Sequence, residues 1–557
     1  MEVYIIIAIA IIIFIIIKLL NDKKRNYEKL VKQIKERYGN LPDREYTYEE
    51  FENISNYYKK HANKDNNVDD ITWNDLNMDS VFIMLNNTLS SPGQEYLYYL
   101  LRTPVFDGKE LKERNRLAEF FDKNETIREK FMIIFAKLGR TRRYSLTEYI
   151  YTLADLEERS SLKNILLALS CLLSIGLIVI KPGIGVVALC VSISASIIYY
   201  MLLKNEIDPY ITTVSFIIKL LQCVDEIEKI ECDELKDYID SLKEAKSKIN
   251  KIRKNSFLLT SGSNLIGGGP ETLLLDYVRM VFHVDIIKFN SMLKQVKHNF
   301  SDIELLISRI GYLESMIAIA SFRKYVNYYT IPEFVDDGHA FLKAIDVYHP
   351  LIKNPVSNSI EVSNGVLITG SNASGKSTFL KTIAINAILS QTIYTALANE
   401  YKTVMFSIYT SMALNDSLEN NESYYIVEIK SLKRIIDKHD KGYILCFVDE
   451  VLRGTNTVER IAASAQILKS LAKDNVMCFA ATHDIELTYL LEDYYNNYHF
   501  EEEIIGNDIR FDYKLKCGRS LTKNAIKLLN IIGYSDDIIN DANNSAKHFV
   551  ETGKWEL

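Results

Sequence analysis

The chain has 557 residues, of which 48% are hydrophobic and 11% aromatic, enough to fill several domain cores and too many for a disordered protein. Its net charge of −7 excludes a strong attraction to nucleic acid at the level of the whole chain, so any such binding needs a local patch. The seven cysteines are scattered and form no Cys-x-x-Cys pair. This pattern favours reduced thiols in the cytosol or membrane over a disulfide framework.

The first feature along the chain is an unbroken apolar run, Val3–Ile17, extended by Leu19 and Leu20 and followed by a basic cluster at 23–25. Its length is near the lower limit for crossing a bilayer. A cleaved signal peptide is the alternative, but the basic residues follow the apolar run and no small-residue cleavage site comes after it. We therefore predict an N-terminal transmembrane anchor at residues 1–22.

Residues 23–70 are polar and rich in Tyr, Lys, Glu and Asn, which indicates a helix followed by a linker. In residues 71–162 apolar side chains recur at helical spacing, as at Leu97, Leu100 and Leu101. This segment is predicted to be the first part of a helical core.

Two further apolar runs, Ile165–Ile180 and Ile184–Leu203, are separated only by Lys-Pro-Gly. Neither run carries a charge, and small residues in both would let two helices approach closely. A buried hairpin of a soluble protein is the alternative, but both runs exceed the usual length of a core helix. We predict a transmembrane helical hairpin at residues 163–204.

The basic cluster at 23–25 predicts the topology, because positive residues next to membrane spans stay in the cytoplasm. The N-terminus would then lie outside, and the hairpin would return the chain after Leu203 to the cytoplasm. We expect a multi-pass protein of the cell membrane with three transmembrane helices.

Residues 205–335 again have the pattern of long helices. They contain a basic cluster that is the one local patch suited to nucleic acid or anionic lipid, although a solvated helix face is the alternative. Its members are Lys243, Lys246, Lys248, Lys251, Arg253 and Lys254. From residue 340 to 557 short apolar strands alternate with helices, which predicts a parallel α/β sheet.

The most specific motif of the chain lies between the apolar run Val366–Thr369 and a helical pattern from Thr378 onward. A strand, a glycine loop ending in Lys-Ser and a helix form the context of a phosphate-binding P-loop, which predicts ATP as ligand. Lys376 would reach the β and γ phosphates, and the Ser377 hydroxyl would hold Mg²⁺. The residues expected to contact the nucleotide are Gly370, Ser371, Asn372, Ala373, Ser374, Gly375, Lys376, Ser377 and Thr378.

Two later strands end in residues that complete an ATPase site. Tyr443–Val448 is followed by Asp449, a predicted Mg²⁺ ligand, and by Glu450, predicted to orient or deprotonate the attacking water. Val476–Ala481 is followed by His483, which we expect to sense the γ-phosphate.

Together these motifs resemble the MutS family, relatives of the ABC ATPases. The loop Thr369–Thr378 looks like the family's TGPNMGGKST, Asp449–Thr457 looks like DEIGRGTST, and Ala481–Thr488 looks like ATHYFELT. The resemblance implies an α plus α/β multidomain fold: an all-α core and lever region, here with transmembrane helices, and a C-terminal P-loop ATPase domain of ABC type at 340–557.

The segment Asn421–Glu428 is similar to the family's signature loop. The resemblance therefore implies a homodimer with composite ATP sites, in which Ser423 acts in trans. Residues at about 520–548 resemble the family's dimerising helix-turn-helix. Within the motifs, Leu452 replaces the usual glycine and Asn456 the usual serine.

Nothing before residue 70 is long enough for the family's mismatch-reading domain. Two functions stay open: a membrane-anchored MutS-like ATPase that contacts mismatched or branched DNA, and an ATP-driven conformational machine at the membrane without DNA. An ABC transporter fits less well, because the LSGGQ signature is absent and three helices make a poor translocation path.

Overall fold

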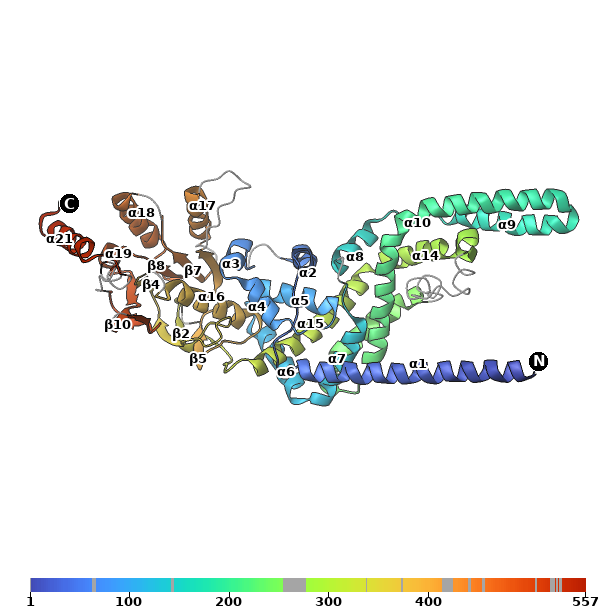
Figure 1. Ribbon diagram of the computed structural model, residues 1–557, viewed down its shortest axis with the longest axis horizontal. Coiled ribbons are helices and arrows are strands. Elements are labelled where there is room, and N and C mark those ends of the chain that lie inside the picture. Colours follow the sequence, from blue (N-terminus) through green and yellow to red (C-terminus); the bar gives the residue numbers. More distant parts are fainter. Residues whose placement is uncertain are drawn as a thin grey trace. The chain divides into compact units, whose positions relative to one another are not determined.

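The computed structural model describes residues 2–62, 67–141, 145–253, 277–336, 338–371, 374–412, 424–438, 442–452, 456–505, 508–520, 526, 529 and 533–556 (Figure 1). The chain forms two compact units. The helical unit comprises residues 1–62, 84–99 and 116–325, and the sheet unit comprises residues 63–83, 100–115 and 326–557.

The helical unit is built from long helices around a buried central helix, α15 (Phe300–Tyr325). Its other helices are α1 (Glu2–Arg37), α2 (Tyr48–His61), α7 (Glu125–Leu138), α8 (Leu146–Asp155), α9 (Leu162–Ile180), α10 (Pro182–Ile227), α11 (Lys236–Ile249) and α14 (Val284–His298). Helices α4 (Met78–Leu85), α5 (Ser91–Arg102) and α6 (Gly108–Lys123) cross the boundaries between the two units.

Helix α5 lies directly against α15 because a glycine removes the side chain between them. A Cβ atom added at Gly311 would lie 2.5 Å from the Pro92 carbonyl oxygen. Next to this contact, the buried Glu314 carboxylate accepts hydrogen bonds from the backbone N–H groups of Leu89 and Ser90. The start of α5 is therefore fixed on α15 by close packing and by a buried polar network.

Helix α1 crosses the boundary predicted between an anchor at 1–22 and a linker from 23. The change from apolar to charged residues does not break the helix, because Lys, Glu and Arg are good helix formers. Its C-terminal end is docked on the helical core: Lys35 Nζ lies 3.0 Å from Glu129, and the next residue after the helix, Tyr38, donates a 2.7 Å hydrogen bond to Asp122. Most side chains of the predicted anchor lie outside the described residues.

Among the described residues, three helical segments are long and apolar enough to cross a membrane: Leu162–Ile180, Pro182–Lys204 and Phe300–Tyr325. The third is α15, whose apolar stretch is 83% buried within the protein, so it is a core helix. The first two are only 17% and 11% buried, and they match the predicted hairpin. Exposed apolar surfaces of this size are typical of sites covered by lipid or by another protein.

The helical hairpin is not an isolated element. Its second helix continues without a break from Pro182 to Ile227, well past the predicted boundary at 204. Its base carries buried polar contacts, in which His283 lies 3.0 Å from both the Asn164 Oδ1 atom and the Ser196 carbonyl oxygen. Any displacement of the hairpin is therefore coupled to the helical core.

A buried carboxyl group in α5 gives the helical unit a testable pH dependence. Glu95 accepts hydrogen bonds from Thr147 Oγ1 and the Leu146 N–H, but burial dominates and raises its pKa to about 8. The folded protein therefore keeps this proton to a higher pH than the unfolded chain, whose value is near 4.5. The stability that protonated Glu95 contributes is complete below the pKa of Glu95 in the unfolded chain, and it is lost as the pH rises toward 8.

We expect the free energy of unfolding of Glu95→Gln, minus that of wild type, to rise by a few kcal/mol between pH 5 and pH 8. The reason is that only wild type carries the group whose pKa shifts, and each pKa unit corresponds to about 1.4 kcal/mol. Thermal melting of the two full-length proteins between pH 5 and pH 8 measures this. The exposed Glu157→Gln serves as the matched control. A stability difference that does not change with pH would contradict the assignment.

The sheet unit contains a six-stranded sheet, ordered β12-β9-β4-β8-β7-β6, and a four-stranded sheet, ordered β1-β5-β2-β3. All pairs of the larger sheet are parallel except β12 with β9. Its strands are β4 (Gly365–Thr369), β6 (Ser407–Ser411), β7 (Ile444–Asp449), β8 (Val476–Ala481), β9 (Tyr495–His499) and β12 (Lys516–Cys517). The predicted parallel sheet is confirmed.

The remaining elements surround these strands. The smaller sheet consists of β1 (Glu333–Phe334), β2 (Leu342–Val347), β3 (Asn358–Val362) and β5 (Glu400–Thr403), and β10 (Glu502–Ile505) pairs with β11 (Asp508–Phe511). The helices are α3 (Asp70–Asp75), α16 (Lys376–Thr392), α17 (Tyr424–Ile436), α18 (Thr457–Ser470), α19 (Ile485–Leu490) and α21 (Asp536–Thr552).

Part of the segment predicted as helical core, 71–162, belongs to the sheet unit instead. Helix α3 packs on β6, where the buried Asp75 carboxylate accepts hydrogen bonds from Thr410 Oγ1 at 2.6 Å and from the Met412 N–H at 2.9 Å. Arg434 of α17 also forms an ion pair with Asp69, the N-cap of α3. Helix α3 is therefore held by bonds to residues far away in the sequence.

Candidate functional site

The candidate site lies at one edge of the larger sheet. Strands β4, β8 and β7 are neighbours and parallel, so the loops that follow them meet at the same edge. These loops carry the predicted P-loop, the acidic pair Asp449–Glu450 and His483. The structure thus brings together the three motifs that the sequence places far apart.

The P-loop has a backbone that depends on glycine at two positions. Gly370 has a φ of 147° and Gly375 a φ of 107°, both in the region that side chains disfavour. A Cβ atom at Gly370 would also lie 2.6 Å from the Phe500 carbonyl oxygen. Gly375 directly precedes α16, so the loop leads into a helix N-terminus that favours bound phosphate.

Lys376 is buried at the start of α16, and its ammonium group donates hydrogen bonds to the Gly370 and Ser371 carbonyl oxygens at 2.8 and 2.7 Å. Burial lowers the pKa of Lys376, and the nearby carboxylates of Asp449, Glu450 and Glu502 oppose this shift. A desolvated cation of this kind gains strongly from a bound polyphosphate.

The residues next to Lys376 fit the remaining groups of a magnesium nucleotide. Burial, together with the nearby Glu450, raises the pKa of Asp449, and the neighbouring Ser377 hydroxyl opposes this shift. A cation beside Asp449 would offset the unfavourable burial of its negative charge. Carboxylate and hydroxyl oxygens are ligands that Mg²⁺ prefers. Among the described residues the buried Ser374 hydroxyl has no hydrogen-bond partner, as expected of a donor directed at a phosphate oxygen.

Glu450 and His483 form a pair at the ends of β7 and β8. The Nε2 atom of His483 lies 2.7 Å from the Glu450 carboxylate. Glu450 has a left-handed backbone with φ of 58°, held by a 3.0 Å hydrogen bond from its N–H to the Ala481 carbonyl oxygen. Strained non-glycine residues of this kind concentrate at functional sites, where the surrounding structure enforces the geometry.

An ion pair that sequence analysis missed positions His483. Arg460 of α18 binds both carboxylate oxygens of Asp484, at 2.9 and 2.6 Å. The Asp484 N–H donates to the Thr482 hydroxyl at 3.0 Å. The residues on both sides of His483 are therefore fixed, and the only sequence signal was the acidic residue directly after the histidine.

A cavity of about 510 Å³ adjoins the P-loop and has a volume typical of small-molecule sites. Beyond P-loop residues and Glu450, it is lined by side chains that suit a flat aromatic base, among them His349, Val356, Phe500 and Tyr513. Burial, assisted by Lys381, lowers the pKa of His349 to about 4, so its imidazole is neutral at pH 7. Sequence analysis did not assign these residues to the site.

Several predicted site residues lie outside the described residues: Asn372 and Ala373 of the P-loop, and Ser423 of the signature loop. The loop at 453–455 also lies outside them, as does much of the predicted helix-turn-helix at 520–548, of which α21 is described. Their predicted roles remain predictions.

Leu452, which replaces the usual glycine, is buried in the hydrophobic core of the sheet unit and has a left-handed φ of 56°. Leu452→Gly would relieve backbone strain of about 1 kcal/mol. Loss of the buried side chain costs about 2–5 kcal/mol, so we expect the variant to be less stable by about 1–4 kcal/mol. Thermal or urea unfolding of both proteins tests this, and a more stable variant would contradict it.

Three members of the basic cluster of the helical unit are paired with carboxylates. Lys246 lies 3.0 Å from Asp225 and 2.7 Å from Glu228, and Arg253 also pairs with Asp225. Lys248 is paired with Glu244 and Asp302, at 3.1 and 3.3 Å. This pattern is that of a helix face with internal ion pairs, and Lys254 lies outside the described residues.

Comparison with known proteins agrees with this site. Residues 366–550 match the profile of MutS domain V. The chain is 30% identical over 315 residues to MutS protein homolog 4 of Mus musculus, covering 53% of this chain and 32% of that protein. It is 25% identical over 327 residues to DNA mismatch repair protein MutS of Finegoldia magna, covering 56% and 38%.

A third relative is Endonuclease MutS2 of Clostridium novyi, 28% identical over 283 residues that cover 49% of this chain and 33% of that protein. The chain thus spans about a third of the length of these relatives. The P-loop, Asp449, Glu450 and His483 all fall within the residues matched to domain V, the ATPase domain of the family. Over these residues the chain is similar to proteins of the MutS family.

Proposed function

We propose that this protein binds and hydrolyses ATP with Mg²⁺ at the edge of β4, β8 and β7. The observation that carries the proposal is the convergence of a buried P-loop lysine, Asp449 beside Ser377, and the Glu450–His483 pair. Each group has the chemistry and position that phosphoryl transfer to water requires.

In this mechanism Lys376 turns from the loop carbonyls to the β and γ phosphates. Tyr513 and the neutral imidazole of His349 flank the base. Ser377 and Asp449 would hold Mg²⁺, which when bound neutralises charge on the phosphates. Glu450 accepts a proton from water as the water oxygen bonds to the γ-phosphorus and the bond to the bridging oxygen breaks. His483 holds one Glu450 oxygen, which leaves the other for water.

The proposed working form is a homodimer in which Ser423 of each subunit completes the ATP site of the other. Mixing Ser423→Ala protein with Lys376→Ala protein then yields hybrid dimers with one site free of both defects. ATPase activity of the mixture should exceed the sum of the two separate variants. A mixture with no gain would argue against the trans arrangement.

We also propose that the helical hairpin and the N-terminal apolar segment hold the protein in the cell membrane, with the ATPase domain in the cytoplasm. The exposed apolar surface of α9 and of α10 up to Lys204 supports this placement. Membrane fractionation of the full chain, with extraction by detergent but not by high salt or alkaline carbonate, is the expected result. Release by carbonate would contradict a spanning hairpin.

Two relatives are named for mismatch repair or endonuclease activity, so a role on mismatched or branched DNA is one candidate. The second candidate is an ATP-driven conformational machine at the membrane without DNA. The pairing of three members of the basic cluster with carboxylates, together with the net charge of −7, favours the second.

Steady-state ATPase activity of the detergent-solubilised protein separates these candidates. It is measured with and without duplex, mismatched and branched DNA, at two salt concentrations. Stimulation by DNA that fades with salt would support the DNA role. ATPase activity that is indifferent to every DNA would support the machine without DNA, and no activity under any condition would contradict the proposed hydrolysis.

A further inference from the structure

The helical unit contains a second polar cavity, of about 520 Å³, that plays no part in the ATPase chemistry. It lies between the C-terminal end of α1, the segment before α2, the residues just before α5 and the residues just after α7. Three arginines line it: Arg37, Arg44 and Arg140. We refer to it as the arginine pocket.

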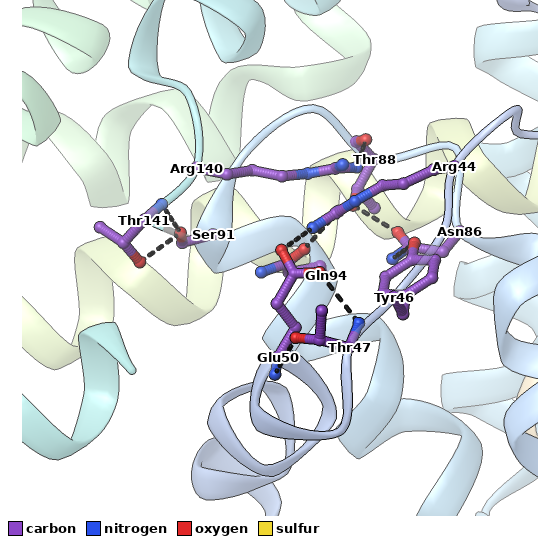
Figure 2. Close-up of polar contacts among 10 residues, drawn as sticks. All are labelled: Arg44, Tyr46, Thr47, Glu50, Asn86, Thr88, Ser91, Gln94, Arg140 and Thr141. Carbon is purple, nitrogen blue, oxygen red and sulfur yellow. Dashed lines mark hydrogen bonds and ion pairs between the residues drawn. The ribbon is translucent and has the colours of Figure 1, made fainter. Parts of the chain in front are cut away.

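Each arginine is held in place by hydrogen bonds from its own side chain. Arg37 donates to Asn87 Oδ1 at 3.0 Å, and Arg140 donates to the Thr88 carbonyl oxygen. Arg44 donates to Gln94 Oε1 at 3.1 Å and forms a 2.8 Å ion pair with Glu50. Figure 2 shows the side chains of Arg44 and Arg140 extending toward each other. The guanidinium groups are therefore fixed before any ligand arrives.

The segment that carries Arg44 is itself rigid. Thr47 and Glu50 form a capping box at the start of α2, and the guanidinium of Arg44 lies 4.4 Å from the centre of the Tyr46 ring. The Tyr46 hydroxyl accepts a 2.8 Å hydrogen bond from Asn86. On the far side, Thr141 next to Arg140 is fixed by a 2.7 Å hydrogen bond from its N–H to Ser91 Oγ.

Some guanidinium donors of the pocket are not used within the protein. Among the described residues neither Arg37 nor Arg140 forms an ion pair with a carboxylate, and the buried Nε of Arg140 has no hydrogen-bond partner. A buried donor left unpaired is unfavourable, and more so when the group is charged. The buried carboxylate of Glu314, whose charge acts on both Arg37 and Arg140, already accepts hydrogen bonds from the Leu89 and Ser90 N–H groups.

The three positive charges also disfavour one another. Burial first, and then the charge of Arg44, lower the pKa of Arg140 to about 10, with a smaller effect from Arg37. Burial likewise lowers the pKa of Arg37. A bound anion would offset this repulsion and occupy the unused donors at the same time.

We propose that the arginine pocket binds a small phosphorylated molecule, whose phosphate groups accept hydrogen bonds from Arg37, Arg44 and Arg140. Guanidinium groups match the geometry of phosphate oxygens, which makes arginine the preferred residue for this contact. The exposed carboxylates of Asp43 and Glu45 also line the pocket and accept hydrogen bonds from hydroxyl groups. A phosphate ester with hydroxyl groups, such as a sugar phosphate, satisfies both kinds of lining.

The pocket adjoins the end of the helix that begins with the predicted membrane anchor, since Arg37 is the last residue of α1. A ligand that binds Arg37 and Arg140 together joins the end of α1 to the residues after α7. Its binding free energy would be added to the stability of this junction.

Calorimetric titration of the full-length, detergent-solubilised protein tests the proposal. The Lys376→Ala variant is used throughout, so that the P-loop lysine contributes nothing to phosphate binding. We expect pyrophosphate and glucose 1-phosphate to bind and glucose to give no heat. Addition of Arg37→Gln or Arg140→Gln should weaken binding of both phosphate compounds at least tenfold, roughly the loss of one charge-assisted hydrogen bond.

Arg159→Gln is the matched control, because Arg159 is an exposed arginine of the same unit that pairs with Glu206 outside the pocket. It should bind like the parent. If Arg140→Gln proves unstable in thermal melting, Arg37→Gln supplies the comparison. Absence of binding by both phosphate compounds would overturn the proposal, as would equal binding of glucose or unchanged affinity in the two pocket variants.

Discussion

Lys376→Ala is expected to abolish ATP turnover and to weaken ATP binding at least 100-fold. The lysine is a desolvated cation whose hydrogen bonds go to the Gly370 and Ser371 carbonyl oxygens and which can turn to the phosphates. Two charge-assisted hydrogen bonds together contribute about 3 kcal/mol or more, which corresponds to that factor. Because burial of this charge is itself unfavourable, the folded protein should lose little stability.

Equilibrium binding of ATP to the detergent-solubilised protein measures the effect, together with steady-state hydrolysis and thermal melting. Lys469→Ala is the control, because Lys469 is an exposed lysine of α18. It should leave binding and turnover unchanged. Tight ATP binding by a well-folded Lys376→Ala protein would refute the P-loop assignment.

The strands of the site could be predicted from the sequence almost residue by residue. The strand Val476–Ala481 was predicted with the bounds that the structure has, and β4 begins one residue before the predicted Val366. Short apolar runs that end in polar residues are local signals, and the meeting of their ends follows from parallel pairing. The sequence alone therefore predicts that Lys376, Asp449, Glu450 and His483 lie in one site.

Other parts of the fold depend on contacts between residues far apart in sequence. Asp75 bonds to Thr410 across 335 residues, and nothing in the local pattern around Asp75 distinguishes a helix of the sheet unit from one of the helical unit. The pairing of Arg460 with Asp484 and the placement of His349 beside the P-loop are equally non-local. A local pattern predicts an element, but not the partner on which it packs.

Glu450→Gln is expected to slow the chemical step while leaving ATP binding intact. Removing the carboxylate that accepts the proton of water should lower turnover about 10²- to 10⁴-fold, the usual contribution of a general base. ATP binding should persist, because Lys376, Ser377 and Asp449 are unchanged. The protein should then accumulate as a long-lived ATP-bound dimer, since the step that ends this state has been slowed.

Single-turnover hydrolysis and size-exclusion chromatography in detergent with ATP and Mg²⁺ measure the two parts of this result. Glu459→Gln, an exposed change on α18, is the matched control. His483→Ala should show a smaller loss, because His483 acts by holding the Glu450 carboxylate 2.7 Å away and not by accepting the proton. Normal turnover by Glu450→Gln would place the base elsewhere, and an equal or larger loss in His483→Ala would assign the proton transfer to the histidine instead.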